Sequence, residues 1–500
     1  MALSFQQKPT DTADKIPVLT NWTPVIGYML KESSISGLFY YKLVLEVYIG
    51  ADVTTASRKI AKLKQRRNGY PSDVSGNAAR AYFDLRDIIN SQLVDTISDQ
   101  NSSAHQLKTI HKVGVNVATK PFSINGDKTQ TYDDGSTTKS QILQISVKGY
   151  QHYSDAANTS PTDQLSGAID STGAPLWYLP ASLPLFTARN SSTDYLQSEQ
   201  FQVFQINDSN ARFLSDIQLS AGEIKSGTQY RNYVQETDYH TLGFLNGEDD
   251  FDSKGRYFII KYYNSSNVEI NSGTEKKLSN KSDAGGAKPL TGGSDEVDKD
   301  TERLVYIGCG PGNLEAQTYD NDAKPSNNSG WAYYTIQAST DGSTEMSALY
   351  YFFKQDGSCK GFKVRRLAWR NSLGCWDYFN FKMKSEQTVK VERNNYSTLI
   401  GDFNSNRFSY SNSERGKSTR QTTAIVEETL NTDWITEQDA ELLEKLIIST
   451  NVEMVENDDT TYTQAVMVTD SSFVRKTVAN NKMIQYTIKI EYANNINTNS

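Results

Sequence analysis

The stretch that decides the fold is Gly361–Lys382, GFKVRRLAWRNSLGCWDYFNFK. Two runs with a period of two flank the turn-rich residues Asn371–Gly374. Alternation on both sides of a glycine-containing turn is typical of a β-hairpin. The second run, Trp376–Phe381, carries large rings on both of its faces, which predicts a strand that is covered on both sides. We therefore expect this hairpin to lie at the centre of a β core.

The length and composition limit the classes of protein to which the chain can belong. A chain of 500 residues has room for about three or four domains. Hydrophobic residues make up only 37% of it, and they include 29 tyrosines, which suit interfaces. The net charge of −8 and the absence of a basic tail argue against a nucleic-acid partner. We expect the single basic cluster, Arg58–Arg67, to be a solvated face.

Cysteine and histidine usage argues against disulfides and metals. Three cysteines do not make a disulfide framework, and the four histidines lack zinc-site spacing. No apolar run reaches the ~20 residues of a membrane-spanning helix, and residues 1–15 do not have the pattern of a signal peptide. We therefore predict no metal, no cofactor, no membrane span and synthesis in the cytoplasm.

The pattern along the chain predicts a mainly β protein. Strands are indicated at Leu38–Ile49, Tyr257–Tyr263 and Met483–Tyr492, whereas apolar residues recur at helical spacing in Ala81–Leu93. Thr436 begins the one strong helix, because Asp439 three residues later completes a capping-box pattern. The fold class that we predict is several β-sandwich-like domains in series with a small α+β C-terminal domain.

These patterns also place the domain boundaries. The predicted parts are an extended arm over 1–24, a β-sandwich with a short helix over 25–160, a second β domain over 161–270, a polar loop or linker over 271–302, a third β domain with the central hairpin over 303–400, and an α+β domain over 401–500. The linker has almost no large apolar residue, so it cannot bury enough surface to offset its ordering entropy.

Two motifs could carry chemistry, but each has a simpler structural interpretation. Gly308–Gly312 resembles the glycine motif of S-adenosylmethionine-dependent methyltransferases, although the sequence after it has no helical period. We interpret it as a strand that ends in a Gly/Pro turn. Asp250–Gly255 resembles half of a calcium loop, but lysines stand where ligands belong. We interpret it as a hairpin turn, and we assign no catalytic residue.

Four adjacent tyrosine pairs stand out: Tyr40-Tyr41, Tyr262-Tyr263, Tyr333-Tyr334 and Tyr350-Tyr351. Neighbours on a strand point to opposite faces, so one ring of each pair is expected to be exposed or in an interface. We favour subunit contact over stacking on sugars. The interaction candidates are Tyr41, Tyr263, Tyr334, Tyr351, Trp376 and Tyr378.

Asn371, Gly374, Asp377 and Phe379 form an N-x-x-G-x-x-D-x-F pattern that resembles a signature of virion structural proteins of tailed bacteriophages. The segments from Asp433 to Ile447 and from Val466 to Ser472 are similar to the end of those proteins. The resemblance implies a structural, non-enzymatic component of the tail, baseplate or neck. Its partners would be other virion proteins and copies of itself.

Two alternative functions remain open at this point. The first is a tail protein that binds a host-surface glycan or receptor, which would use exposed aromatic residues. The second is an enzyme, either a methyltransferase that uses Gly308–Gly312 or a glycosidase, whose two carboxylates need no sequence proximity.

Overall fold

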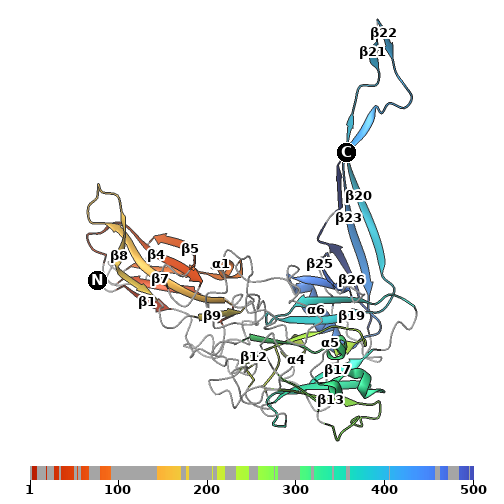
Figure 1. The fold of residues 1–500 in the computed structure, drawn as a ribbon. Helices are drawn as coiled ribbons and strands as arrows, with labels where there is room; N and C mark the ends of the chain where they lie inside the picture. The colour runs from red at the N-terminus through yellow and green to blue at the C-terminus, as the bar shows by residue number, and fades with distance from the viewer. Residues whose placement is uncertain are drawn as a thin grey trace. The chain divides into compact units, whose positions relative to one another are not determined.

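The computed structural model describes residues 3–7, 18–19, 27–32, 35–49, 53, 58–66, 79–91, 143–170, 176–179, 205–206, 211–219, 232–246, 257–274, 276–279, 304–316, 320–339, 343–355, 361–404, 406–456, 462–470, 474, 484–494 and 496–499 (Figure 1). Over these residues the protein is mainly β, with its strands in several separate sheets, as predicted. The chain divides into two units: Met1–Gln355 with Arg370–Asp377, and Asp356–Trp369 with Tyr378–Ser500.

Two sheets build the N-terminal part of the first unit. One has the order β1-β3-β6, formed by Leu3–Gln7, Gly27–Glu32 and Ala79–Asp84. The other has the order β2-β9-β7-β4-β5, formed by Val18–Leu19, Leu176–Leu179, Leu143–Ser154, Phe39–Ile49 and Arg58–Arg66, with β8 (Thr162–Asp170) beside β7. A Cβ added at Gly149 of β7 would lie 2.8 Å from Cδ2 of Leu30 on β3, so the two sheets pack face to face as in a sandwich.

Part of the expected extended arm pairs within the chain, because β1 pairs with β3 and β2 pairs with β9. One prediction for this region needs revision. The expected helix over 81–93 begins instead as strand β6, and helix α1 covers only Arg86–Asn90. Pairing of β6 with β3 outweighs the local helical period, since tertiary contacts override propensity.

The described residues of the first unit also hold two further sheets, two short α-helices and the 3-10 helices Asn321–Ala323 and Pro325–Asn328. A five-stranded sheet has the order β11-β17-β16-β13-β14, formed by Asn232–Val234, Tyr350–Lys354, Tyr333–Ser339, Tyr257–Tyr263 and Lys277–Ser279. A three-stranded sheet has the order β10-β12-β15, formed by Gln205–Ile206, Thr241–Asn246 and Leu304–Gly308. The α-helices are α4 (Asp216–Leu219) and α5 (Pro311–Ala316).

The five-stranded sheet crosses the predicted domain boundaries. Strand β13 lies in the predicted second domain and pairs with β16 of the predicted third domain. Strand β14 falls within the predicted linker and pairs with β13, so the start of that linker is part of the sheet. Residues 280–302 of the linker lie outside the described residues. Long-range strand pairing of this kind leaves no local signal in the sequence.

The second unit is built on an eight-stranded sheet. Its order is β19-β18-β24-β25-β26-β23-β20, formed by Trp376–Phe381, Arg365–Arg370, Val452–Glu456, Tyr462–Val468, Thr487–Tyr492, Lys417–Asn431 and Glu386–Ser397, with β27 (Ile496–Asn499) beside β23. The predicted central hairpin supplies β18 and β19, and every residue of β19 is buried. Strands on both sides of residue 400 share this sheet, so no separate α+β domain begins there.

Helix α6 (Glu437–Ile448) begins as its sequence predicts. The Thr436 side chain accepts the Asp439 N–H at 3.2 Å, and the Asp439 carboxylate accepts the Thr436 N–H at 3.0 Å. This reciprocal pair satisfies two backbone donors that a helix start leaves unpaired.

Strands β20 and β23 continue past β26 as a long ribbon, and β27 lies beside β23 along part of it, from Gln421 to Ala424 (Figure 1). Twelve residue pairs join them, from Glu386 opposite Thr429 to Ser397 opposite Lys417. The short strands β21 (Asp402–Asn404) and β22 (Arg407–Ser409) form the far end of this hairpin. All twelve residues of β20 are exposed to solvent.

Candidate functional site

Four of the six predicted interaction residues belong to the core. Tyr41, Tyr334, Trp376 and Tyr378 are at most 8% exposed, so their rings serve packing in this fold. In two of the adjacent pairs the outward ring is the other partner: Tyr40 is 59% exposed, whereas the Tyr41 ring stacks on Tyr153. The alternation of faces is as predicted, but the choice of ring within two of the pairs needs correction.

The other two candidates, Tyr263 and Tyr351, lie in one aromatic stripe. The stripe consists of Tyr233, Phe353, Tyr351, Tyr333 and Tyr263, which are half-buried and come from strands β11, β17, β16 and β13. Tyr333 joins the two candidates, because its ring centroid lies 4.8 Å from that of Tyr263 and 6.3 Å from that of Tyr351. The sequence contained the signal for Tyr333 in its Tyr333-Tyr334 pair.

Several rings of this stripe stack face to face with one another. Tyr263 and Tyr333 stack at an interplanar angle of 10°, and Tyr333 and Phe353 at 28°. Tyr351 and Phe353 stack at 17°. Sugars and planar ligands bind to open ring faces, whereas the stacked faces in this stripe already cover one another. The geometry therefore suits polar and edge-on contact with a protein surface better than stacking on a glycan.

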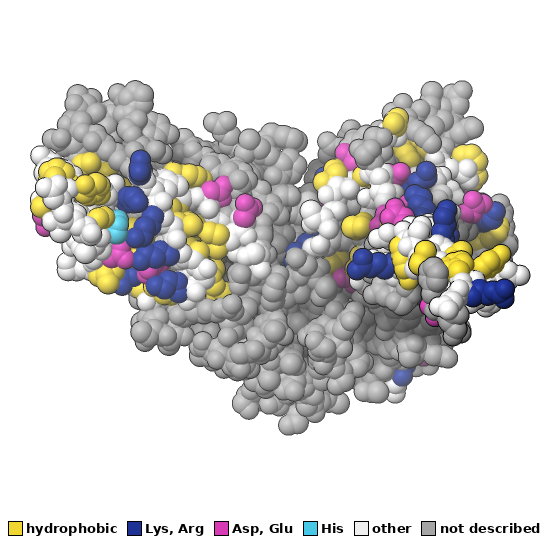
Figure 2. Space-filling view, turned by 90° about the horizontal axis from the view of Figure 1, so that it is seen from above, with side chains coloured by type: hydrophobic (Ala, Val, Ile, Leu, Met, Phe, Trp, Pro, Cys, Tyr) yellow, Lys and Arg dark blue, Asp and Glu magenta, His cyan; other side chains and the backbone are white. Residues whose placement is uncertain are grey.

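The basic cluster lies on β5, and acids of the same sheet neutralise much of its charge. Lys59 Nζ lies 2.9 Å from Glu46 Oε1, and Lys62 Nζ lies 2.6 Å from Asp163 Oδ2. Burial alone would raise the pKa of Asp163, but the hydrogen bonds from Lys62 and His152 outweigh it and lower the pKa to about 2. Figure 2 shows the row of Lys and Arg side chains with acidic side chains beside it. The cluster is a paired polar face, which does not favour an anionic partner.

The glycine motif packs tightly against another backbone segment of the same chain. A short helix, α5, does follow the strand β15, contrary to the expectation that no helix would. However, a Cβ at Gly310 would lie 2.5 Å from the Asp238 carbonyl oxygen, and one at Gly312 would lie 2.7 Å from the Thr237 oxygen. The Cys309 N–H also donates to the His240 carbonyl at 2.8 Å. Residues 237–240 therefore occupy the face of the turn on which a cofactor would have to bind.

The turn of the central hairpin holds a buried polar network. The Asn371 side-chain oxygen accepts the N–H groups of Leu373 and Cys375, each at 3.0 Å. Gly374 supplies the left-handed conformation that the turn requires, with φ of 81°. Asp377 accepts the Ser215 hydroxyl at 2.6 Å and the Asn371 side-chain amide at 3.2 Å. The N-x-x-G-x-x-D pattern thus has a structural explanation in this chain.

Asp216 is the second acid of this network. Its backbone N–H donates to Asp377 Oδ2 at 2.9 Å, and its carboxylate accepts both the hydroxyl and the N–H of Ser372. Burial of Asp377, and then the charge of Asp216, raise the pKa of Asp377 to about 7. Both oxygens of Asp377 bond to donors of the chain, and its side chain is 0% exposed. The pair therefore fixes the turn in place, and it lacks the access to substrate that a glycosidase pair needs.

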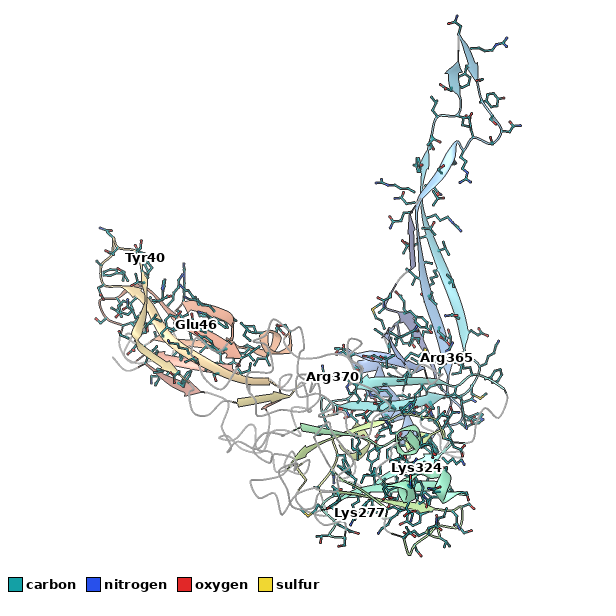
Figure 3. The ribbon with its side chains drawn as sticks, in the orientation of Figure 1. Tyr40, Glu46, Lys277, Lys324, Arg365 and Arg370 are labelled. Carbon is teal, nitrogen blue, oxygen red and sulfur yellow. The ribbon has the colours of Figure 1, made fainter. Side chains whose placement is uncertain are left out.

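The ribbon carries side chains along its whole length (Figure 3), and seven large apolar side chains on it are exposed in the described part of the chain. Val389 and Val391 of β20 are 56% and 43% exposed, and they share a ribbon face with Val426, which lies opposite Val389. At the far end the exposed set is Tyr396, Leu399, Ile400, Phe408 and Tyr410, of which Leu399 is 88% exposed. None of these residues is among the interaction candidates predicted from the sequence. The only local signal was the alternation of Val389 and Val391 with charged residues.

The end of the ribbon is nevertheless well defined. The Glu414 carboxylate accepts the N–H groups of Gly401 and Ser411. Gly401 has φ of 94°, and the Phe408 ring packs against it so closely that a Cβ would lie 2.5 Å from that ring. The exposed apolar residues are thus displayed from a turn with its own hydrogen bonds, which is the arrangement of an interaction surface.

Several other predicted features lie outside the described residues. These are the half calcium loop Asp250–Gly255, His105, His111 and Cys359, whereas Cys309 and Cys375 are buried free thiols. In the described part of the chain, no group of three or more His, Cys, Asp or Glu side chains is placed to hold a metal ion. No helix there combines the length and the apolar character needed to span a bilayer.

A comparison with models of known protein families gives no match for the chain, and a comparison with curated proteins gives none either.

Proposed function

We propose that the chain is a structural component of a tailed-phage virion, and that it assembles into the tail, baseplate or neck through its β domains and its ribbon. The observation that carries this proposal is the ribbon. It displays Val389, Leu399 and Tyr410 with exposures of 56%, 88% and 69%. Apolar surface of this kind becomes stable when a partner covers it.

The buried network of the hairpin supports the same role. The resemblance to virion proteins depends on Asn371, Gly374 and Asp377. In this chain these residues form a turn in which Asn371 accepts a backbone N–H and Asp377 accepts the Ser215 hydroxyl. These residues hold a turn whose carboxylate is buried, and a purely structural turn of this kind is consistent with a structural protein.

The aromatic stripe is a second surface for a neighbouring protein, such as another virion protein. Its rings lie side by side across four strands of one sheet. The alternative is a tail protein that uses the stripe for a host-surface glycan. A glycan array with the purified chain, and with a Tyr333→Ala variant as its control, separates the two. Specific binding that the variant loses would favour the glycan.

The test of the main proposal is the composition of the particle. Purified virions of the phage that carries this sequence should contain the chain by quantitative mass spectrometry, at a fixed copy number per particle. Immunogold labelling with antibodies against the ribbon should mark one defined position on the tail, baseplate or neck. Virions that lack the chain after full purification, while infected cells contain it, would overturn the proposal.

A further inference from the structure

Strand β20 is the free edge of the eight-stranded sheet. It is last in the strand order, and within the described residues it pairs only with β23. Its twelve residues extend over about 40 Å, so a row of backbone N–H and C=O groups faces outward. A long edge of this kind is a template for another strand, and proteins usually block it with proline or with repelling charges. No proline occurs in Glu386–Ser397.

The charges on this edge attract a second copy of the same edge instead of repelling it. Lys390 and Glu392 lie on one face, two residues apart, and Val391 between them lies on the other face. If two β20 strands pair antiparallel about Val391, Lys390 of each copy lies opposite Glu392 of the other. Two ion pairs then flank a Val391–Val391 contact.

Neighbouring registers lack this match. Centring the pair on Lys390 or on Glu392 places that residue opposite its own copy, with like charges facing. Centring it on Val389 places Glu386 of each copy opposite Glu392 of the other. Centring it on Thr388 does place Lys390 opposite Glu386, but only residues 386–390 of β20 then face one another, and Val391 falls outside them. The register centred on Val391 pairs residues 386–396 of both copies, matches opposite charges and joins the apolar faces at Val391, so it is the favoured one.

Both charged side chains are available for this pairing. Glu392 has no ion-pair partner in the part of the chain that the structure describes, and its side chain is exposed. Lys390 contacts Glu427 of the neighbouring strand β23, and 58% of its side chain remains exposed. An ammonium group has three donors, so Lys390 can bond Glu427 and a second carboxylate together.

We propose that the partner of the ribbon is a second copy of this chain, which pairs edge to edge along β20 in an antiparallel, two-fold arrangement centred on Val391. The two ribbons then form one continuous sheet with the central order β23-β20-β20-β23, and β27 of each copy lies beside its β23. The Val389, Val391 and Val426 side chains of both copies line one continuous face of it. The contact is isologous, so it closes at two copies. It names one partner of the assembly proposed above, and its meaning for a virion rests on that proposal.

The test is a charge-swap cycle on the full-length chain. Lys390→Glu alone and Glu392→Lys alone each place like charges opposite one another twice. The double variant Lys390→Glu/Glu392→Lys restores both pairs with their signs reversed. We expect each single variant to weaken dimerisation by about tenfold and the double variant to return to within about threefold of the parent, by sedimentation velocity and native mass spectrometry. Arg407→Glu, on β22 at the far end, is the matched control and should leave dimerisation unchanged.

The double variant also separates dimerisation from folding. The carboxylate introduced at position 390 would still lie beside Glu427 within the chain, so damage inside the ribbon would persist in the double variant. A restored dimer can therefore come only from the contact between copies. A Val391→Cys variant should form a cross-linked dimer on mild oxidation, in contrast to Tyr410→Cys. A parent chain that stays monomeric up to about 100 μM, a double variant as weak as the single ones, or a closed oligomer larger than two would overturn the proposal. These outcomes leave the particle test of the proposed function unaffected.

Discussion

Asp377 accepts the backbone N–H of Asp216 at 2.9 Å, which places two acidic residues in one buried network. Ser215 and Asn371 complete the shell around the Asp377 carboxylate. A polar network with every oxygen bonded fixes a turn more firmly than apolar contacts do, but it makes the turn sensitive to the proton on that carboxylate.

The first prediction concerns pH. Burial and the nearby charge of Asp216 raise the pKa of Asp377 to about 7, whereas an unfolded Asp titrates near ~3.9. Between these values the folded state binds a proton that the unfolded state lacks. The contribution of Asp377 to stability is therefore complete below about pH 4 and is lost as the pH rises to about 7.

The Asp377→Asn variant isolates this contribution. Its amide nitrogen can donate to Ser215, and its oxygen can accept from Asp216 and Asn371, so the fold should persist. Relative to this variant, the parent should lose on the order of 3 kcal/mol of unfolding free energy between about pH 4.5 and about pH 7.5. Hydrogen exchange of peptides that cover 371–377 measures the difference. Parallel pH curves for the two proteins would contradict the prediction.

The second prediction concerns the ion pair between Arg365 and Glu428. Arg365 Nε lies 2.7 Å from Glu428 Oε1, although β24, β25 and β26 stand between their strands in the sheet order. Glu428 is 1% exposed, and its other oxygen accepts the Tyr492 hydroxyl at 2.7 Å. Arg365→Met should destabilise the second unit by about 2–4 kcal/mol, because it leaves a buried carboxylate without its cation.

The double variant Arg365→Met/Glu428→Gln is the control for this prediction. It removes the charge together with its partner, so it should recover at least half of the loss. Urea unfolding followed by tryptophan fluorescence gives the values. An Arg365→Met variant as stable as the parent would show that the pair adds nothing.

The third prediction concerns the glycine turn. A Cβ at Gly310 would lie 2.5 Å from both the Asp238 oxygen and the His240 nitrogen, and backbone atoms cannot move aside as a side chain can. Gly310→Ala should therefore destabilise the first unit by about 2–4 kcal/mol. Gly273→Ala is the matched control, since nothing lies within 4 Å of its added Cβ. Equal thermal unfolding midpoints for the two variants would show that residues 237–240 do not pack on this turn.

The fourth prediction concerns the start of helix α6. Thr436→Ala removes the acceptor for the Asp439 N–H and should cost about 1 kcal/mol of stability. Thr450→Ala, an exposed substitution past the helix end, should change stability by less than ~0.5 kcal/mol. Urea titrations compare the two variants. Thr436→Asp should restore the loss, because aspartate is also a good N-cap residue.

Local patterns predicted those elements whose stabilising partners lie nearby in the chain. The hairpin turn is one example, since Asn371 bonds the backbone of residues two and four positions ahead. The capping box of α6 is another. Period-two alternation also predicted that one ring of each tyrosine pair faces outward, because the geometry of a strand requires it.

Partners far along the chain decided the rest. Pairing of β6 with β3 turned part of an expected helix into a strand, and pairing of β13 with β16 joined two expected domains. Which tyrosine of a pair is buried depends on which sheet face meets a second layer, and for Tyr333 and Tyr334 the buried ring is Tyr334.

The sequence by itself determined that this chain is mainly β, where its central hairpin turns and where helix α6 begins. These features follow from side-chain periodicity and from hydrogen bonds that span only a few residues. Only the tertiary structure decided that the Val389 and Val391 side chains stand on an exposed ribbon and that Asp377 is sealed beside Asp216. Burial is a property of what packs against a residue, and for these residues that depends on segments far away in the chain.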